Sequence, residues 1–133
     1  MSIISKETEI QERLSSVYDA LKSTKEQLRN ELSVLRERYE DACLHHIKSG
    51  FQKEQVWMQE SDNHHRKYLE YDIHNFLLDI ISDYRDLDGY FPEYSLMVNN
   101  IEELMFAYVY EEKYEVAAIL KQWLNRFKII DSI

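Results

Sequence analysis

Apolar residues recur at helical spacing along the first third of the chain. Four leucines form a ladder with a step of seven residues: Leu14, Leu21, Leu28 and Leu35. Ile10 and Val17 stand four positions before the first two leucines and complete one face of an amphipathic helix. Ser5 is a candidate N-cap and Gly50 a candidate stop, so the pattern predicts one helix over residues 6–48. At about 1.5 Å per residue this helix is roughly 64 Å long, which predicts an elongated molecule or a partner chain.

The leucine ladder has two interpretations that the sequence leaves open. In the first, it is the core-facing stripe of a helical bundle within one chain. In the second, it is the seam of an intermolecular coiled coil confined mainly to residues 6–30. The residues that hold a homodimer together are then Leu14, Leu21, Leu28 and Leu35. The positions between the leucines favour the bundle, because they are apolar only near the start and become polar at Thr24 and Glu31.

The rest of the chain predicts further helices. Apolar residues at steps of three and four predict a second helix over residues 52–86, and the sequence leaves open whether it continues through the polar pair Asp62-Asn63. The stretch that follows holds the only proline and is the clearest loop, and a helical hairpin is predicted over residues 95–128. The length fits a single domain over residues 1–133. We therefore expect an all-α, elongated helical bundle with a long, coiled-coil-like N-terminal helix and a C-terminal helical hairpin.

The C-terminal segment also carries a short motif. Its residues are Met105, Tyr114, Glu115, the pair Ala117-Ala118 and Leu120. Over residues 105–127 this arrangement resembles the UVR motif of bacterial excinuclease subunits and of some protease-adaptor proteins. The resemblance implies a two-helix hairpin used for protein–protein contact, in which the alanine pair lets the helices approach closely, and it implies no catalysis. The sequence departs from the motif after the leucine, where Lys121-Gln122 replace an Arg-Asp pair.

Charge is distributed unevenly along the chain. The net charge is −9, and residues 68–115 alone carry 12 acidic and two basic residues. Nucleic-acid affinity depends largely on neutralising phosphates with Lys and Arg, so this composition argues against direct binding of nucleic acid or of an anionic membrane surface. No apolar run approaches the ~20 residues that span a bilayer. The acidic segment instead predicts a basic protein partner.

The same segment holds eight of the ten tyrosines. Tyrosine is common at recognition surfaces because it offers a large, rigid contact area and a hydroxyl group. We therefore expect a non-enzymatic adaptor or inhibitor whose acidic, tyrosine-rich surface binds a basic partner. A sharper version is that this surface mimics nucleic acid and binds a nucleic-acid-binding protein. The residues in or beside predicted turns, and so predicted to bind the partner, are Tyr90, Tyr94, Tyr110, Glu111 and Glu112.

Two other classes of function remain as alternatives. Three carboxylate–histidine pairs with a spacing of four residues could bind metal in a helical bundle: Asp41 with His45, Glu60 with His64, and Glu70 with His74. The plainer interpretation is solvent-facing histidines beside carboxylates, and we predict no metal site and no cofactor. The other alternative is a structural subunit that only assembles through its coiled coil.

Catalytic and compartment signals are few. Two isolated glycines cannot form a phosphate-binding loop, and we predict no enzymatic activity. The single cysteine, Cys43, is expected to be buried and permits no internal disulfide. Together with the lack of a signal-peptide pattern, this predicts a cytoplasmic protein.

Overall fold

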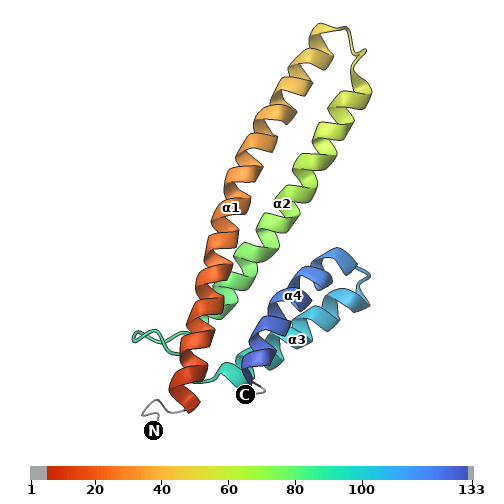
Figure 1. The fold of residues 1–133 in the computed structure, drawn as a ribbon. Helices are drawn as coiled ribbons and strands as arrows, with labels where there is room; N and C mark the ends of the chain where they lie inside the picture. Colours follow the sequence, from red (N-terminus) through yellow and green to blue (C-terminus); the bar gives the residue numbers. More distant parts are fainter. Residues whose placement is uncertain (1–5, 132–133) are drawn as a thin grey trace.

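The computed structural model describes the backbone of residues 6–131 and the side chains of residues 6–128, and this part of the chain forms four helices and no strand. They are α1 (Lys6–Lys48), α2 (Glu54–Asp83), α3 (Tyr94–Tyr110) and α4 (Tyr114–Asp131). The predicted all-α, elongated bundle with a C-terminal hairpin is confirmed (Figure 1). Ser5, the predicted N-cap, lies outside the described residues.

The ends of α1 and α2 follow from local backbone chemistry. Gly50 has a φ of +70° and donates its N–H to the carbonyl of Ile47 at 3.1 Å, which stops α1 where the sequence predicts. Phe51 also has a positive φ, so α2 begins only at Glu54 and is shorter than the predicted residues 52–86. It runs without interruption through Asp62-Asn63.

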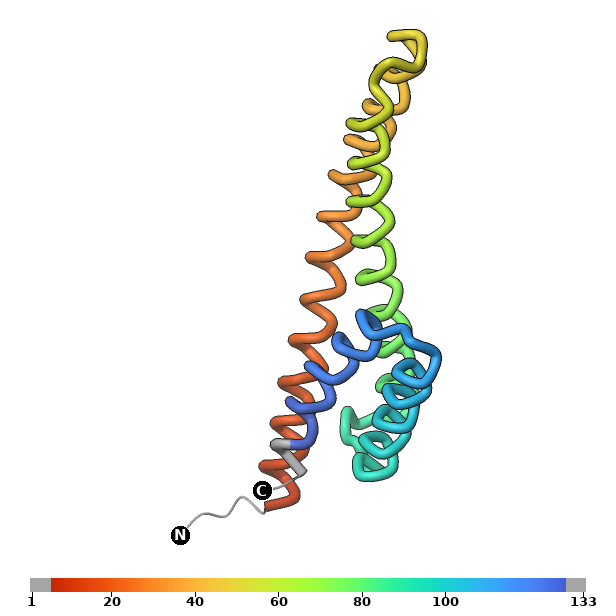
Figure 2. The backbone as a smooth tube through the Cα atoms, turned by 90° about the vertical axis from the view of Figure 1, so that its right-hand side faces the viewer, coloured from red at the N-terminus to blue at the C-terminus, as the bar shows by residue number. Residues whose placement is uncertain are grey.

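The molecule has two regions of different construction. In the arm, residues 29–68, α1 and α2 extend together beyond the reach of the other helices (Figures 1 and 2). In the body, residues 6–28 and 69–128, all four helices contribute to one core. Within the body α4 packs against both α1 and α2, and α3 packs on α4 (Figure 2). The C-terminal hairpin is therefore attached to the long pair of helices mainly through α4.

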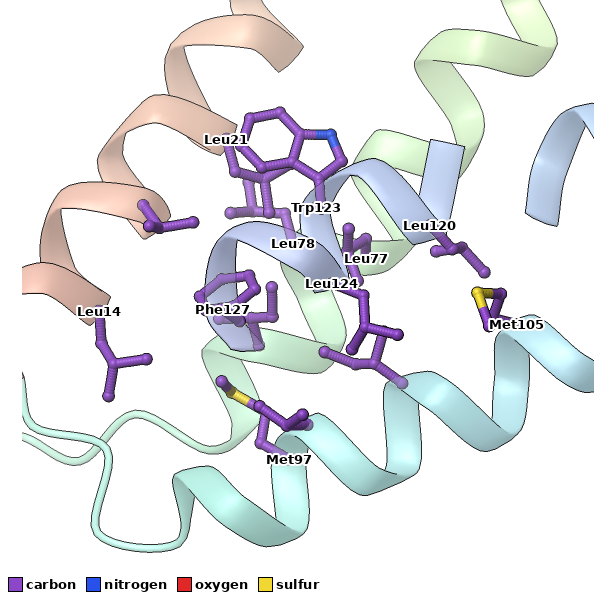
Figure 3. Close-up of a cluster of buried hydrophobic side chains, with 14 of the residues drawn as sticks. Leu14, Leu21, Leu77, Leu78, Met97, Met105, Leu120, Trp123, Leu124 and Phe127 are labelled. Carbon is purple, nitrogen blue, oxygen red and sulfur yellow. The ribbon is translucent and has the colours of Figure 1, made fainter. Parts of the chain in front are cut away.

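The core of the body is built from apolar side chains of all four helices that point toward one another (Figure 3). The largest fully buried ones include Leu14, Leu77, Met97, Leu124 and Phe127. Fully burying a side chain of this size contributes about 1.5–3 kcal/mol, so this cluster is the main source of stability.

The leucine ladder belongs mostly to this chain's own interior. Leu14 and Leu21 have no exposed surface, Leu28 is 4% exposed, and Leu35 in the arm is half-buried. The bundle interpretation therefore describes the first three residues, because helices of the same chain already cover them. Self-association through these leucines would require the core to open.

Polar contacts inside the body join α2 to α4 and the α2–α3 loop to α1. His74 is buried rather than solvent-facing as predicted: its Nδ1 lies 2.7 Å from the carbonyl oxygen of Glu70, and its Nε2 accepts a 3.0 Å hydrogen bond from the indole N–H of Trp123. This bond joins α2 to α4. The buried side-chain amide of Gln11 exchanges two hydrogen bonds with the backbone of Phe91, at 3.0 and 2.6 Å. It thereby holds the α2–α3 loop on α1, three residues before α3 begins at Tyr94.

Among the helices of residues 6–131, none combines the length and the apolar character needed to cross a membrane.

Candidate protein-binding groove

A groove of about 750 Å³ lies between α2 and the α3–α4 turn, two segments that Figure 1 shows on the same side of the molecule. Its volume is within the range of small-ligand and anchor-residue sites, about 300–1,000 Å³. The apolar and aromatic residues that line it are Leu69, Ile73, Phe76, Tyr108, Tyr114 and Val116. The charged residues that line it are Asp72, Asp79, Glu112, Lys113 and Glu115.

The α2 side of the groove is one stripe of the helix. Leu69, Asp72, Phe76 and Asp79 are separated by three or four residues and therefore share a face. Leu69 and Phe76 remain 39% and 43% exposed, because α1 and α4 cover the neighbouring stripe that includes Leu77. Leu69 and Phe76 lie seven residues apart and form an apolar strip that the described part of the chain leaves exposed.

The other side of the groove depends on how α3 ends. The N–H of Lys113 bonds to the carbonyl of Tyr108 at 2.9 Å, and the N–H of Glu112 bonds to Val109 at 3.0 Å. These two bonds form a Schellman motif, which places Glu112 in the left-handed region with a φ of 62°. Glycine is the usual residue at this position because it has no Cβ. The reversal brings Tyr108 and Tyr114 to the same groove, with Glu112 between them.

The charge of the groove is strongly negative. Four carboxylates, Asp72, Asp79, Glu112 and Glu115, line it, and Lys113 is the only base among its described lining residues. The Lys113 ammonium lies 3.5 Å from a carboxylate oxygen of Glu111, just outside the groove. Several carboxylates around an apolar strip favour a ligand that is both apolar and cationic.

The structure separates the residues predicted to bind a partner into two groups. Tyr110, Glu111 and Glu112 lie at the α3–α4 turn, where Glu112 lines the groove and Tyr110 is 91% exposed. Tyr90 and Tyr94 lie at the opposite end of α3, which is about 24 Å away for a helix of this length. The predicted residues therefore form two groups at opposite ends of α3, and only the group at the α3–α4 turn adjoins the groove.

The sequence reasoning missed the α2 side of the groove. The sequence pattern predicts a helix over residues 52–86 but assigns no site to Leu69, Asp72, Phe76 or Asp79. The apolar face of α2 is wider than the core needs, and this width is the signal that could have identified them. The stripe that contains Ile73 packs into the core, whereas Leu69 and Phe76 lie beside it.

In the arm, His46, His64 and Cys43 take part in ring stacking and hydrogen bonds within the chain. His46 stacks on Trp57 with ring centroids 5.4 Å apart, and its Nδ1 accepts the N–H of Lys53 at 3.1 Å. Trp57 donates its indole N–H to the sulfur of Cys43, which is half-buried and not fully buried as predicted. His64 stacks on Tyr39. Among residues 6–128, no three His, Cys, Asp or Glu side chains are grouped so that they could hold a metal ion.

α3 and α4 form a two-helix hairpin in which Ala117 is buried and Ala118 is exposed, so only one residue of the alanine pair lies in a packed position. Comparison of the chain with protein-family models, with curated proteins and with solved structures found no match. Kinship with the UVR motif therefore stays a prediction.

Proposed function

We propose that this protein is a non-enzymatic adaptor or inhibitor that binds a basic protein partner through the groove between α2 and the α3–α4 turn. The observation that carries the proposal is the combination of an uncovered apolar strip, Leu69 and Phe76, with four carboxylates in one groove. A partner segment with an apolar anchor flanked by Lys or Arg satisfies both features at once. Burial of the anchor supplies affinity, and the charges supply orientation and association rate.

The partner segment that fits best is an amphipathic helix. The groove runs along a helix face on one side and ends at a helical turn on the other, and an apolar strip with a seven-residue step matches anchors at i and i+7 of a second helix. Tyr110 and Glu111, which are exposed beside the groove, extend the surface available to the partner.

The test is capture of partners from a lysate with matched charge-reversal variants. The groove variant carries Asp72→Lys and Glu115→Lys; the control carries Glu37→Lys and Glu40→Lys, two exposed positions of the arm with the same change in net charge. We expect the wild-type protein and the control to retain a basic protein that high salt elutes, and the groove variant to lose it. Equal retention by both variants would contradict the proposal.

The sharper version, mimicry of nucleic acid, has its own test. If the groove carboxylates occupy a nucleic-acid-binding surface of the partner, duplex DNA or RNA releases the captured partner at constant ionic strength. Release by DNA at concentrations where a polyglutamate of equal charge has no effect supports mimicry. No release contradicts mimicry and leaves docking of a basic partner intact.

A further inference from the structure

The groove already contains one cation, the ammonium of Lys113, and hydrogen bonds fix the backbone of this residue. The N–H of Lys113 bonds to the carbonyl of Tyr108, and its own carbonyl accepts the N–H of Ala117 at 3.1 Å in the first turn of α4. The backbone of Lys113 is therefore held in place, and only its side chain can change conformation. That side chain lies with Nζ 5.8 Å from the centroid of the Tyr108 ring and 3.5 Å from the Glu111 carboxylate.

These two contacts are the ones that a cationic side chain of a partner would make. An ammonium or guanidinium within about 6 Å of an aromatic centroid is attracted by the face of the ring, and a nearby carboxylate adds charge complementarity. Lys113 and Glu111 are 59% and 57% exposed at their side chains. Such solvated pairs are weak and exchange readily, so the contacts hold Lys113 in place without excluding a competitor.

We infer that the groove binds a Lys or Arg side chain of the partner against Tyr108, and that Lys113 occupies this cation site in the free protein as an internal competitor. The inference rests on the proposed function and adds a regulatory element to the same site. Lys113 moves away when the partner arrives, and its flexible stem allows this without a change in the backbone. Removal of its charge therefore tightens binding of a cationic ligand, in contrast to the usual loss when an interface residue is altered.

The experiment compares two substitutions with the same effect on net charge. Lys113→Met removes the ammonium and keeps an apolar stem; Lys121→Met removes an exposed ammonium of α4 that does not line the groove. The probes are two synthetic amphipathic helical peptides with the same leucine face, one with lysines flanking that face and one with glutamines. Affinities are measured by calorimetry at low salt, with circular dichroism to verify that each variant is folded.

We expect Lys113→Met to bind the lysine peptide about three- to ten-fold more tightly than Lys121→Met does, as the range for exposed charge contacts allows. The glutamine peptide should not distinguish the two variants. In a Tyr108→Leu background the advantage of Lys113→Met should disappear, because the ring that the cations compete for is gone.

Three results would overturn the inference. Equal affinities of the two lysine variants for the lysine peptide would mean that only net charge matters. Weaker binding by Lys113→Met would make Lys113 a direct contact of the ligand. Failure of every variant, and of the wild-type protein, to bind the lysine peptide would reject the proposed function together with the inference, whereas binding without a difference would reject the inference alone.

Discussion

The body and the arm use the same two helices in different ways. In the body, α1 and α2 are covered by α4 as well as by each other, and nearly all fully buried apolar side chains of the described chain lie there. In the arm, residues 29–68, Ala42 is the only buried side chain, whereas Leu44, Ile47 and Phe51 are exposed. A pair of helices has one interface per helix, so it can bury a small side chain such as Ala42 but leaves the large ones partly exposed. The apolar stripes of α1 and α2 form an enclosed core only where α4 packs against both helices.

Charge divides the two regions in the same way. The arm carries seven basic and seven acidic residues, whereas the body carries nine basic and 17 acidic residues. Four of the acidic residues of the body line the groove and three more stand in the α2–α3 loop, whereas the arm is electrically balanced. The comparison places both the stability and the proposed binding function in the body, and it leaves the arm as an extension held by aromatic stacking and ion pairs.

The largest difference between the regions is expected from core truncation. Leu77→Ala removes a fully buried side chain of the body and should lower the free energy of unfolding by about 2–5 kcal/mol. Leu35→Ala removes the same atoms from a half-buried site in the arm and should cost about 1 kcal/mol or less. Urea unfolding followed by circular dichroism measures both. Equal losses would show that the arm contributes to stability as the body does.

The next effect comes from the polar contact that holds the α2–α3 loop. Gln11→Ala leaves the buried backbone N–H of Phe91 without its acceptor, which should cost about 1–3 kcal/mol. Hydrogen exchange at Phe91 should accelerate. Gln27→Ala is the matched control, because Gln27 is exposed and bonds only to Glu31 within α1. If both variants exchange alike at Phe91, the loop is held by something other than Gln11.

The two residues with a positive φ other than glycine, one in each region, give a sharper comparison. Glu112→Gly and Phe51→Gly both relieve left-handed strain, and each should stabilise its region by about 1 kcal/mol. Only Glu112→Gly removes a carboxylate of the groove, so it alone should weaken binding of the lysine peptide, by about three-fold at low salt. A loss of affinity with Phe51→Gly would place the binding surface in the arm.

The smallest effect concerns the ion pair of the arm. A hydrogen bond from the Lys67 ammonium, supported by one from Gln27, lowers the pKa of the Glu31 carboxyl, and the bond to Glu31 raises the pKa of Lys67. Because the folded-state pKa of Glu31 is lowered, its stabilisation is present above the ordinary carboxyl range and is lost as pH falls through the lowered pKa. Because the folded-state pKa of Lys67 is raised, its part is lost only as pH rises through that raised value.

The check on this pair is a carboxyl NMR titration. Lys67→Met should move the pKa of Glu31 upward, toward its ordinary value, and leave the stability of the body unchanged. Arg36→Met is the control, since Arg36 pairs with Glu40 on the exposed face of α1. An unchanged pKa of Glu31 in Lys67→Met would mean that the pair does not form in solution.

The sequence predicts the elements well because each helix buries one face, and a buried face requires apolar residues at steps of three and four. It also locates the end of α1, since Gly50 supplies the left-handed residue that a helix stop needs. It cannot choose between an internal core and an intermolecular seam for Leu14 and Leu21, because both require the same residues on the same face. That choice depends on where α4 docks.

The groove was predictable only in part. Glu112 and Tyr110 are found because they stand beside a turn, and the acidic character of the segment is visible in the composition. Leu69 and Phe76 become a site only because α4 covers α2 on one stripe and leaves the next one open. The separation of Tyr90 from Tyr110, in contrast, already follows from the predicted helix between them.

The most direct test of the central claim, that the groove is the binding surface, is site-specific photo-cross-linking. A benzophenone amino acid replaces Tyr114 in the groove or, as the comparison, Leu44 in the arm; both side chains are exposed. In lysate at low salt, we predict that position 114 cross-links to a Lys- and Arg-rich segment of one protein, that high salt abolishes the product, and that position 44 gives none. Cross-linking from position 44 alone, or to an acidic segment, would contradict the account.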